Sequence, residues 1–367
     1  MNSKFKYIFI ALGILIVGFI LWYFKSIVTY ILISAVLSIV GKPLVDLLDK
    51  IHIKKIKIPK AISALATLIV IWTVFVLFFR FFIPLIANQA SDLSLIDINT
   101  LTSKFQEPIN KINQLIIDYN ISTENAKTVE DYMSEKIIVF MNGTFLSNFF
   151  NSIVGILGNI FIAAFSISFI TFFFLKDQNL FYNGILIFVP EKLTDNFVHV
   201  LNSIKKLLTR YFIGIIIEVL GVITLVSIGL TIVGINFQSA LVIGLIAGIF
   251  NIIPYIGPLI GSSIGIIIGF ATHINLDFYT ELFPLLLYMA IVFSLVQVVD
   301  NVVFQPFIYS SSVNAHPLEI FLVIMIAASL AGIIGMILAV PTYTIIRVFA
   351  KEFFNNFKVV KKLTEKI

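Results

Sequence analysis

The sequence has little charge and no cysteine. Only 12% of its 367 residues are Asp, Glu, Lys or Arg, and the cysteine count is zero. Without thiols there can be no disulfide, no thiolate metal site and no cysteine nucleophile. Hydrophobic residues make up 59% of the chain and the mean hydropathy is +1.05, which excludes an ordinary soluble globular domain. The composition predicts a polytopic membrane protein.

Motifs for enzyme chemistry are also missing. The chain contains no His-Glu-x-x-His, Gly-x-Ser-x-Gly or Gly-x-x-x-x-Gly-Lys-Ser/Thr pattern, and four scattered histidines do not make a metal site. We therefore expect no enzyme activity and no cofactor. The net charge of +5 comes from lysines in loops beside apolar segments, which indicates membrane topology and not nucleic-acid binding.

Long apolar segments define the fold. A transmembrane helix needs roughly 20 apolar residues. Counting by that length, we expect an all-α protein with about six to eight transmembrane helices and broken or re-entrant helices in its C-terminal half. The apolar segments are 5–24, 27–45, 61–87, 149–175, 211–234, 238–272, 282–308 and 318–349.

Loop charges predict the orientation of the chain. The 42–60 loop carries six lysines against two aspartates, whereas 88–147 carries eight acids against four lysines. Positive loops stay in the cytoplasm, so both termini should be cytoplasmic. The predicted domains are three N-terminal transmembrane helices (1–87), an extracytoplasmic amphipathic helical segment (88–148), a C-terminal transport core (149–350) and a basic cytoplasmic tail (351–367). The amphipathic helices would pack together, lie at the lipid interface, or contact solute or another subunit.

Two apolar segments are too long for one ordinary crossing. The 238–272 segment is interrupted by Asn251-Ile-Ile-Pro-Tyr-Ile-Gly-Pro258, where proline must break a helix and free backbone carbonyls. The 318–349 segment contains Gly332 to Pro341. Each segment can fold back as a hairpin or cross once with a kink, and both alternatives leave the tail inside. As hairpins they would form an inverted repeat whose breaks approach each other near mid-membrane.

Acidic residues remain where basic ones are absent. From Tyr211 to Ile346 there is no lysine or arginine, yet Asp300 lies in an apolar span within a polar stripe formed with Gln297, Asn301 and Gln305. An ionisable group there costs about 2.5–3.5 kcal/mol unless it faces a cavity or a partner. The stripe would bind a cation or polar solute, relay a proton, or tie helices together.

At three further places in the sequence, polar or proline residues have either a functional or a purely structural role. Glu218, two turns into its span, is a second coupling candidate or a structural partner. Asn251 and Tyr255 at the first break would satisfy freed carbonyls or hold solute. His316 and Pro317 open the last segment, where the histidine is a titratable group or simply a solvated one.

Four motifs in this order and spacing resemble the AI-2E (autoinducer-2 exporter) transporter family: Gly248 to Pro258, Val296 to Pro306, His316-Pro317-Leu318, and Gly332 to Pro341. The resemblance covers nearly the whole chain. It implies a permease that oligomerises in the plasma membrane; members export autoinducer-2, and others are linked to sodium/proton antiport or sporulation. The transport-pathway candidates are Asn251, Pro254, Tyr255, Gly257, Pro258, Gln297, Asp300, Asn301, Gln305, Pro306, His316, Pro317, Gly332, Gly335 and Pro341, with Asp300 and Glu218 as coupling groups.

The leading functional hypothesis is an exporter of a small polar organic solute driven by an ion gradient. Na⁺/H⁺ antiport without an organic solute is the second hypothesis, and a non-transporting membrane assembly or sporulation protein is the third. The expected partners are the solute, H⁺ or Na⁺, the lipid bilayer and further copies of the chain.

Overall fold

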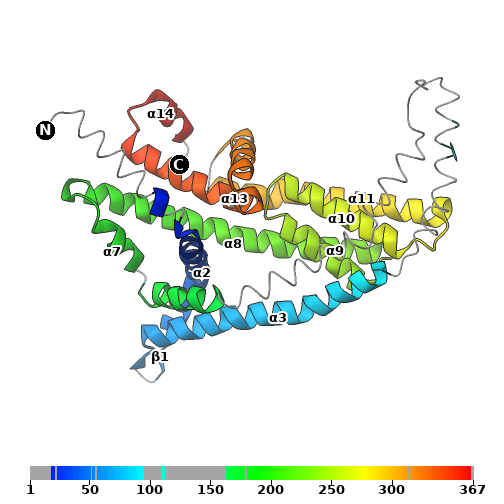
Figure 1. The fold of residues 1–367 in the computed structure, drawn as a ribbon, viewed down its shortest axis with the longest axis horizontal. Helices are drawn as coiled ribbons and strands as arrows, with labels where there is room; N and C mark the ends of the chain where they lie inside the picture. The colour runs from blue at the N-terminus through cyan, green and yellow to red at the C-terminus, as the bar shows by residue number, and fades with distance from the viewer. Residues whose placement is uncertain are drawn as a thin grey trace. The chain divides into compact units, whose positions relative to one another are not determined.

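A computed structural model describes residues 18–20, 23–50, 52–53, 56–94, 110–111, 114, 163–177, 180–312 and 315–364. The chain divides into two compact units: Met1–Phe75 with Leu157–Phe212, and Val76–Ile156 with Ile213–Ile367. Figure 1 labels the helices in chain order. Most of the predicted 5–24 span, most of the 88–148 segment and the first part of the 149–175 span lie outside the described residues.

The described part of the first unit is helical apart from one small hairpin in the loop between two long helices. In that hairpin, strands β1 (His52–Ile53) and β2 (Ile56–Lys57) run antiparallel, with His52 opposite Lys57. The helices of this unit are α2 (Lys25–Asp49), the first part of α3 (Lys60–Ser94), the helix Ala163–Lys176, α7 (Leu180–Leu186), the 3₁₀ turn η1 (Glu191–Leu193) and the first part of α8 (Thr194–Ile232).

Apolar packing and interhelical hydrogen bonds join the helices of the first unit. Val45, Ala64 and Leu175 form its described core cluster. The Ser34 hydroxyl donates to the Ile167 carbonyl at 3.0 Å, and the Trp72 indole donates to Ser168 Oγ at 2.8 Å. Such bonds satisfy polar groups that lipid cannot satisfy.

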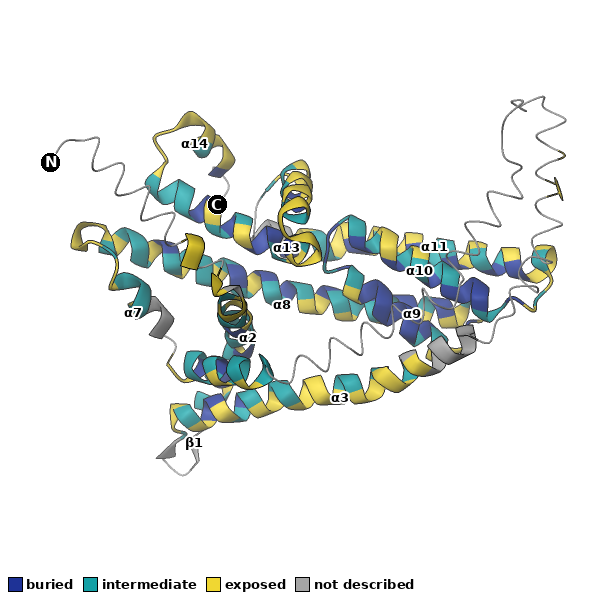
Figure 2. Cartoon of the chain, in the orientation of Figure 1, coloured by how far each residue is buried: buried dark blue, intermediate teal, exposed yellow. Residues whose placement is uncertain are grey.

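The second unit surrounds a larger apolar core built from the end of α8 and the helices that follow it. In Figure 2 its buried residues are concentrated on α9 and the neighbouring helices. The core includes Val226, Ile243, Ile268 and Met289. The elements are α9 (Phe237–Phe250), α10 (Ile256–Thr272), the π-turn η2 (Phe278–Leu282), α11 (Phe283–Val299), the π-turn η3 (Asp300–Phe304), α12 (Gln305–Ser312), α13 (Pro317–Phe353) and α14 (Lys358–Thr364).

A glycine stripe lets α10 approach its neighbours closely. Gly257, Gly261, Gly265 and Gly269 recur every four residues and so lie along one face of the helix. Gly261 contacts the backbone of Ala247 on α9, and the last two glycines contact Phe293 and Met289 on α11. Small residues at a helix interface allow this close packing in membranes.

The helices α9 and α10 form an antiparallel hairpin whose corner is Asn251 to Tyr255. Their 14 and 17 residues correspond to about 21 and 26 Å at 1.5 Å per residue. Each arm is shorter than the hydrocarbon core of roughly 30 Å. The predicted break is therefore confirmed, and of the two alternatives for 238–272 the structure has the hairpin.

The second break lies at the start of the predicted range. Inside α13 the backbone leaves helical geometry at Ala331 (φ −141°, ψ 18°) and Gly332 (φ 59°, ψ −140°). The helix folds back there, so that the Tyr343 hydroxyl reaches Glu319 Oε2 at 3.1 Å. Pro341 is buried within the second arm, which corrects the expectation that the break extends to this proline.

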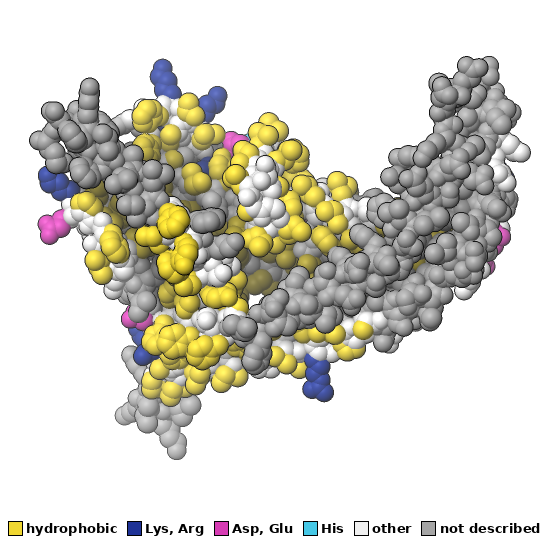
Figure 3. Space-filling view, viewed as in Figure 1, with side chains coloured by type: hydrophobic (Ala, Val, Ile, Leu, Met, Phe, Trp, Pro, Cys, Tyr) yellow, Lys and Arg dark blue, Asp and Glu magenta, His cyan; other side chains and the backbone are white. Residues whose placement is uncertain are grey.

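Five described helices are long and apolar enough to cross a membrane, and each of them contains or overlaps a predicted apolar segment. Hydrophobic side chains also dominate the described surface in Figure 3, as lipid contact requires. The all-α polytopic membrane fold is confirmed. The five helices are Ser26–Asp49, Lys60–Leu85, Glu191–Ile232, Phe278–Ile308 and Pro317–Phe353, the last of which contains the fold-back.

Candidate functional site

Three polar side chains from separate segments meet in the apolar core of the second unit. Glu218 comes from α8, Asn251 from the corner of the first hairpin and Asp300 from the start of η3, and they are 5%, 5% and 1% exposed. Asn251 Nδ2 donates to Glu218 Oε1 at 3.0 Å and to Asp300 Oδ1 at 3.3 Å. One amide therefore links two buried carboxyl groups, and we call these three residues the carboxyl cluster.

Close packing of α8 against the α11 to α12 stretch brings the two carboxyl groups together. On α8, Gly214 lies against Ile308 and Gly221 lies against the Phe304 ring. A side chain at either glycine would strike these partners and push the helices apart. The glycines therefore set the short spacing across which Glu218 and Asp300 share one amide.

Asn251 is placed by the way α9 ends. It is the last residue to continue the helical hydrogen bonding, with its N–H donating to the Ala247 carbonyl at 3.0 Å. Pro254 then prevents the helix from continuing. The sequence left open whether Asn251 satisfies freed carbonyls; in the structure its side-chain amide donates to the two carboxyl groups.

The hairpin corner is a tight, strained turn. Tyr255 has φ 66° and ψ −50°, and the Ile256 N–H donates to the Pro254 carbonyl at 2.8 Å. This combination is a classic γ-turn, a rare conformation that L-residues adopt at a cost. A side chain at Gly257 would strike the Phe250 carbonyl, so only glycine fits there. Backbone strain at a buried corner is typical of functional segments.

The predicted polar stripe forms, and a π-turn extends it. Gln297 Nε2 lies 3.4 Å from Asp300 Oδ2 and 3.1 Å from Asn301 Oδ1. Gln305 Nε2 donates to Asp300 Oδ2 at 2.8 Å. The Gln305 N–H bonds the Asp300 carbonyl five residues back, which is the π-helical pattern. The wider turn places Gln305 over Asp300, and Pro306, which has no N–H, follows it.

The two carboxyl groups have different surroundings. Asp300 accepts hydrogen bonds from three amide groups, those of Asn251, Gln297 and Gln305, whereas Glu218 accepts one from the amide of Asn251. Two negative charges so close in an apolar interior repel each other strongly. Such a pair is suited to taking up a proton or a small cation between its oxygen atoms.

Tyr255 and His316 make their side-chain contacts outside the carboxyl cluster. The Tyr255 ring contacts Phe321 at 6.2 Å between centroids, and Phe321 is ten residues, about 15 Å along the helix, from the second corner. This contact joins the first corner to an arm of the second hairpin, in place of the expected meeting of the two breaks. His316 caps α13 by accepting from the Leu318 N–H at 3.2 Å, next to Pro317.

The remaining candidates sit on individual helices. Gly335 faces the Ala327 carbonyl just beyond the second corner, close to Gly332. Asn301 and Pro306 are exposed on the η3 to α12 stretch, and Pro258 lies in the first turn of α10. Sequence reasoning missed the link between Tyr343 and Glu319, because the two residues lie 24 positions apart and share no motif.

Apolar helices of spanning length around linked intramembrane carboxyl groups define the class of membrane transporters. Residues 8–355 match the family described as "AI-2E family transporter", and the chain belongs to this family.

The names of similar proteins agree with this family. The chain is 29% identical to "Putative transport protein YueF" of Bacillus subtilis (strain 168), over 90% of this chain and 84% of that protein. It is 24% identical to "Putative transport protein MJ1177" of Methanocaldococcus jannaschii, over 91% and 92% of the two chains. It is also 29% identical to "Putative transport protein YrrI" of Bacillus subtilis, over 61% and 60%. The family and these names indicate a multi-pass membrane transport protein and not an enzyme.

Proposed function

We propose that this protein is a secondary transporter that exports a small polar organic solute, such as an autoinducer-2-like signal, and that the carboxyl cluster couples export to an ion gradient. The observation that carries the proposal is the Asn251 amide held between Glu218 and Asp300. This contact ties α8, the hairpin corner and η3 to the charge state of one buried site.

The coupling follows from electrostatics in an apolar medium. With one proton on the pair, a carboxylic acid, a carboxylate and an amide form a satisfied network. Loss of that proton leaves two negative charges around one amide, and repulsion favours separation of α8 from η3. Because Asn251 belongs to the hairpin corner, the hairpin would shift with the charge, which gives two conformations whose populations depend on the proton.

Asp300 and Glu218 would divide the work. Three amides hold the Asp300 carboxyl group in place. It would therefore act as a carboxylate that accepts a hydrogen bond from a hydroxyl or amine of the solute. Glu218 has fewer donors and suits the role of the group that carries the proton. The half-buried Gln297 and the exposed Asn301 extend the polar surface beyond the cluster and supply further hydrogen-bonding groups for a solute.

The test is transport by carboxyl-to-amide variants. Purified protein in proteoliposomes would be given labelled autoinducer-2 as the first probe, with and without an imposed pH gradient. We expect Asp300→Asn and Glu218→Gln each to lower gradient-driven flux at least tenfold. Glu319→Gln is the matched control, because Glu319 is another carboxyl in an apolar helix that accepts a hydrogen bond outside the cluster. Wild-type flux in both cluster variants would disprove the coupling site.

Cation/proton antiport is a second candidate, favoured by the two carboxyl groups beside one amide. Carboxylate and amide oxygens are good ligands for a small hard cation such as Na⁺. The same proteoliposomes distinguish the two functions: Na⁺-driven proton release with no organic solute present supports antiport, whereas proton movement that requires the solute supports export.

We further propose that the protein lies in the plasma membrane as a homo-oligomer with both termini in the cytoplasm. The lysine-rich 42–60 loop and C-terminal tail support this orientation. Because the chain has no cysteine, single cysteines introduced in the 42–60 loop, in 88–148 and in the tail can be labelled without background. A membrane-impermeant maleimide added to intact cells should modify only the 88–148 position.

A further inference from the structure

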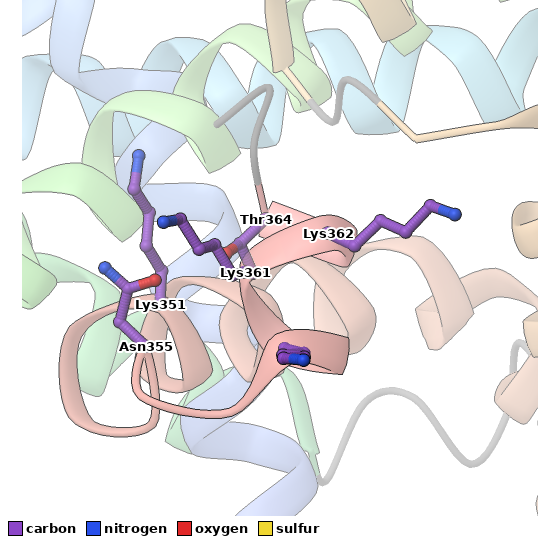
Figure 4. A pocket seen from close by; sticks show the side chains of 6 residues that line it. Lys351, Asn355, Lys361, Lys362 and Thr364 are labelled. Carbon is purple, nitrogen blue, oxygen red and sulfur yellow. The ribbon is translucent and has the colours of Figure 1, made fainter.

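The end of the chain forms a basic pocket that the transport mechanism does not use. It lies where α13 ends and α14 folds back, and its volume is about 460 Å³. Figure 4 shows the Lys351, Asn355 and Lys361 side chains around it. We call it the lysine pocket, and its lining residues are Lys351, Asn355, Lys358, Lys361, Lys362 and Thr364.

Internal contacts hold α14 in the position that creates the pocket. The buried Arg347 side chain on α13 donates through Nη2 to the Leu363 carbonyl near the end of α14. A cation at this position satisfies a carbonyl that the helix leaves without an intrahelical partner. The Thr364 hydroxyl donates to the Val360 carbonyl at 2.7 Å and is itself buried. The pocket is therefore a built feature and not a chance grouping of tail lysines.

The pocket concentrates positive charge. Four of its six described lining residues are lysines, and none of the six is acidic. Ammonium groups that lie near one another repel each other, and an anion among them converts that repulsion into attraction. The polar Asn355 side chain at the rim adds a hydrogen-bonding group. A ligand with several negatively charged oxygen atoms, such as a phosphate, fits this chemistry.

Apolar side chains beside the lysines indicate where the phosphate comes from. Phe357 and Val359 are 63% and 69% exposed, and Phe354 and Leu363 are exposed as well. Lysines and exposed apolar residues close together in one short segment are typical of the membrane interface. The pocket also follows directly after a helix of spanning length. On the predicted cytoplasmic side, anionic lipids attract such clusters.

We propose that the lysine pocket binds the phosphate of an anionic phospholipid head group, with the neighbouring apolar side chains in contact with its acyl chains. Lipid binding would hold α14 at the membrane surface and, through Arg347, would stabilise the second arm of α13.

The test is ligand-dependent stabilisation of the purified full-length protein. The thermal unfolding midpoint in neutral detergent is followed against the concentration of phosphatidylglycerol, phosphatidylcholine or inorganic phosphate, because a ligand that binds the folded state raises the midpoint. We expect phosphatidylglycerol to raise it most. The variant K358Q/K361Q/K362Q should lose at least tenfold in apparent affinity for phosphatidylglycerol.

The control variant K60Q/K192Q/K206Q removes the same charge at exposed lysines outside the pocket and should lose less than twofold. Equal losses of affinity in the two variants would show that the lipid responds to the total positive charge of the protein, and this would disprove the lysine pocket as a binding site. A midpoint shift with inorganic phosphate equal to that with phosphatidylglycerol would show a soluble anion as the ligand and overturn the lipid. Transport is not measured, so neither outcome bears on the proposed export function.

Discussion

The two helical hairpins of the second unit are built differently. The first turns at Pro254 and a strained Tyr255, and its arm α9 is buried along most of its length. The second turns at Gly332, and the apolar residues around its corner, Leu330, Ile333 and Ile334, are 82%, 63% and 64% exposed. A corner packed inside the protein can transmit a change in buried charge. A corner whose apolar side chains face outward depends on lipid or on another chain to cover them.

The largest difference in stability is expected between two variants, each of which removes a polar contact of one hairpin. Asn251→Leu removes the amide between two buried carboxyl groups. Asp300 keeps its bonds from Gln297 and Gln305, but Glu218 loses the donor from Asn251, and an unsatisfied buried polar group costs about 1–3 kcal/mol, more when charged. Tyr343→Phe removes one hydrogen bond to Glu319, which contributes about 1 kcal/mol. The unfolding midpoint in detergent should fall clearly further for Asn251→Leu. Equal midpoints would mean that the carboxyl cluster contributes no more to stability than the single hydrogen bond between Tyr343 and Glu319.

Adding a methyl group to each glycine sharpens the comparison of the corners. In Gly257→Ala the new Cβ strikes the Phe250 carbonyl, and such overpacking costs about 1–3 kcal/mol or more. In Gly332→Ala the surroundings are open, so the cost is that of placing alanine at φ 59° and ψ −140°, a sparsely populated backbone region, about 1–3 kcal/mol. Thermal unfolding measures both. We expect Gly257→Ala to lower the unfolding midpoint further than Gly332→Ala. A failure of Gly257→Ala to fold, with Gly332→Ala folded, would agree with this order, and a lower midpoint for Gly332→Ala would contradict it.

The smallest effect concerns strain at the first corner. Tyr255 has a positive φ, so Tyr255→Gly should be more stable than Tyr255→Ala by about 1 kcal/mol, although glycine usually destabilises a chain. Both variants lose the ring contact with Phe321, which cancels in the comparison. Phe321→Leu removes that contact and leaves the turn intact, and it serves as the control. If the alanine variant is as stable as the glycine variant, the turn is relaxed in solution.

Local patterns predicted much of this architecture. Apolar runs of spanning length indicated the helices, and Pro254 indicated the first break, because proline acts on its own backbone wherever the segment packs. Helical periodicity also predicted the polar stripe, because it places residues three or four positions apart on one face. The stripe consists of Gln297, Asp300, Asn301 and Gln305. The π-turn that places Gln305 over Asp300 could not be predicted, because an i to i+5 bond has no comparable sequence signal. The exact position of the second break, at Ala331 and not near Pro341, was also beyond local rules.

By itself, the sequence determined that this is an all-α membrane protein, that its C-terminal half contains interrupted helices, and that acidic groups lie in them without nearby basic residues. Only the tertiary structure decided which of these groups meet. Asn251 lies 33 residues from Glu218 and 49 from Asp300, and no spacing rule connects such positions. They meet because glycines at 214, 221 and 261 allow three helices to pack closely, and whether a glycine faces a neighbouring helix or lipid is settled only when the helices assemble.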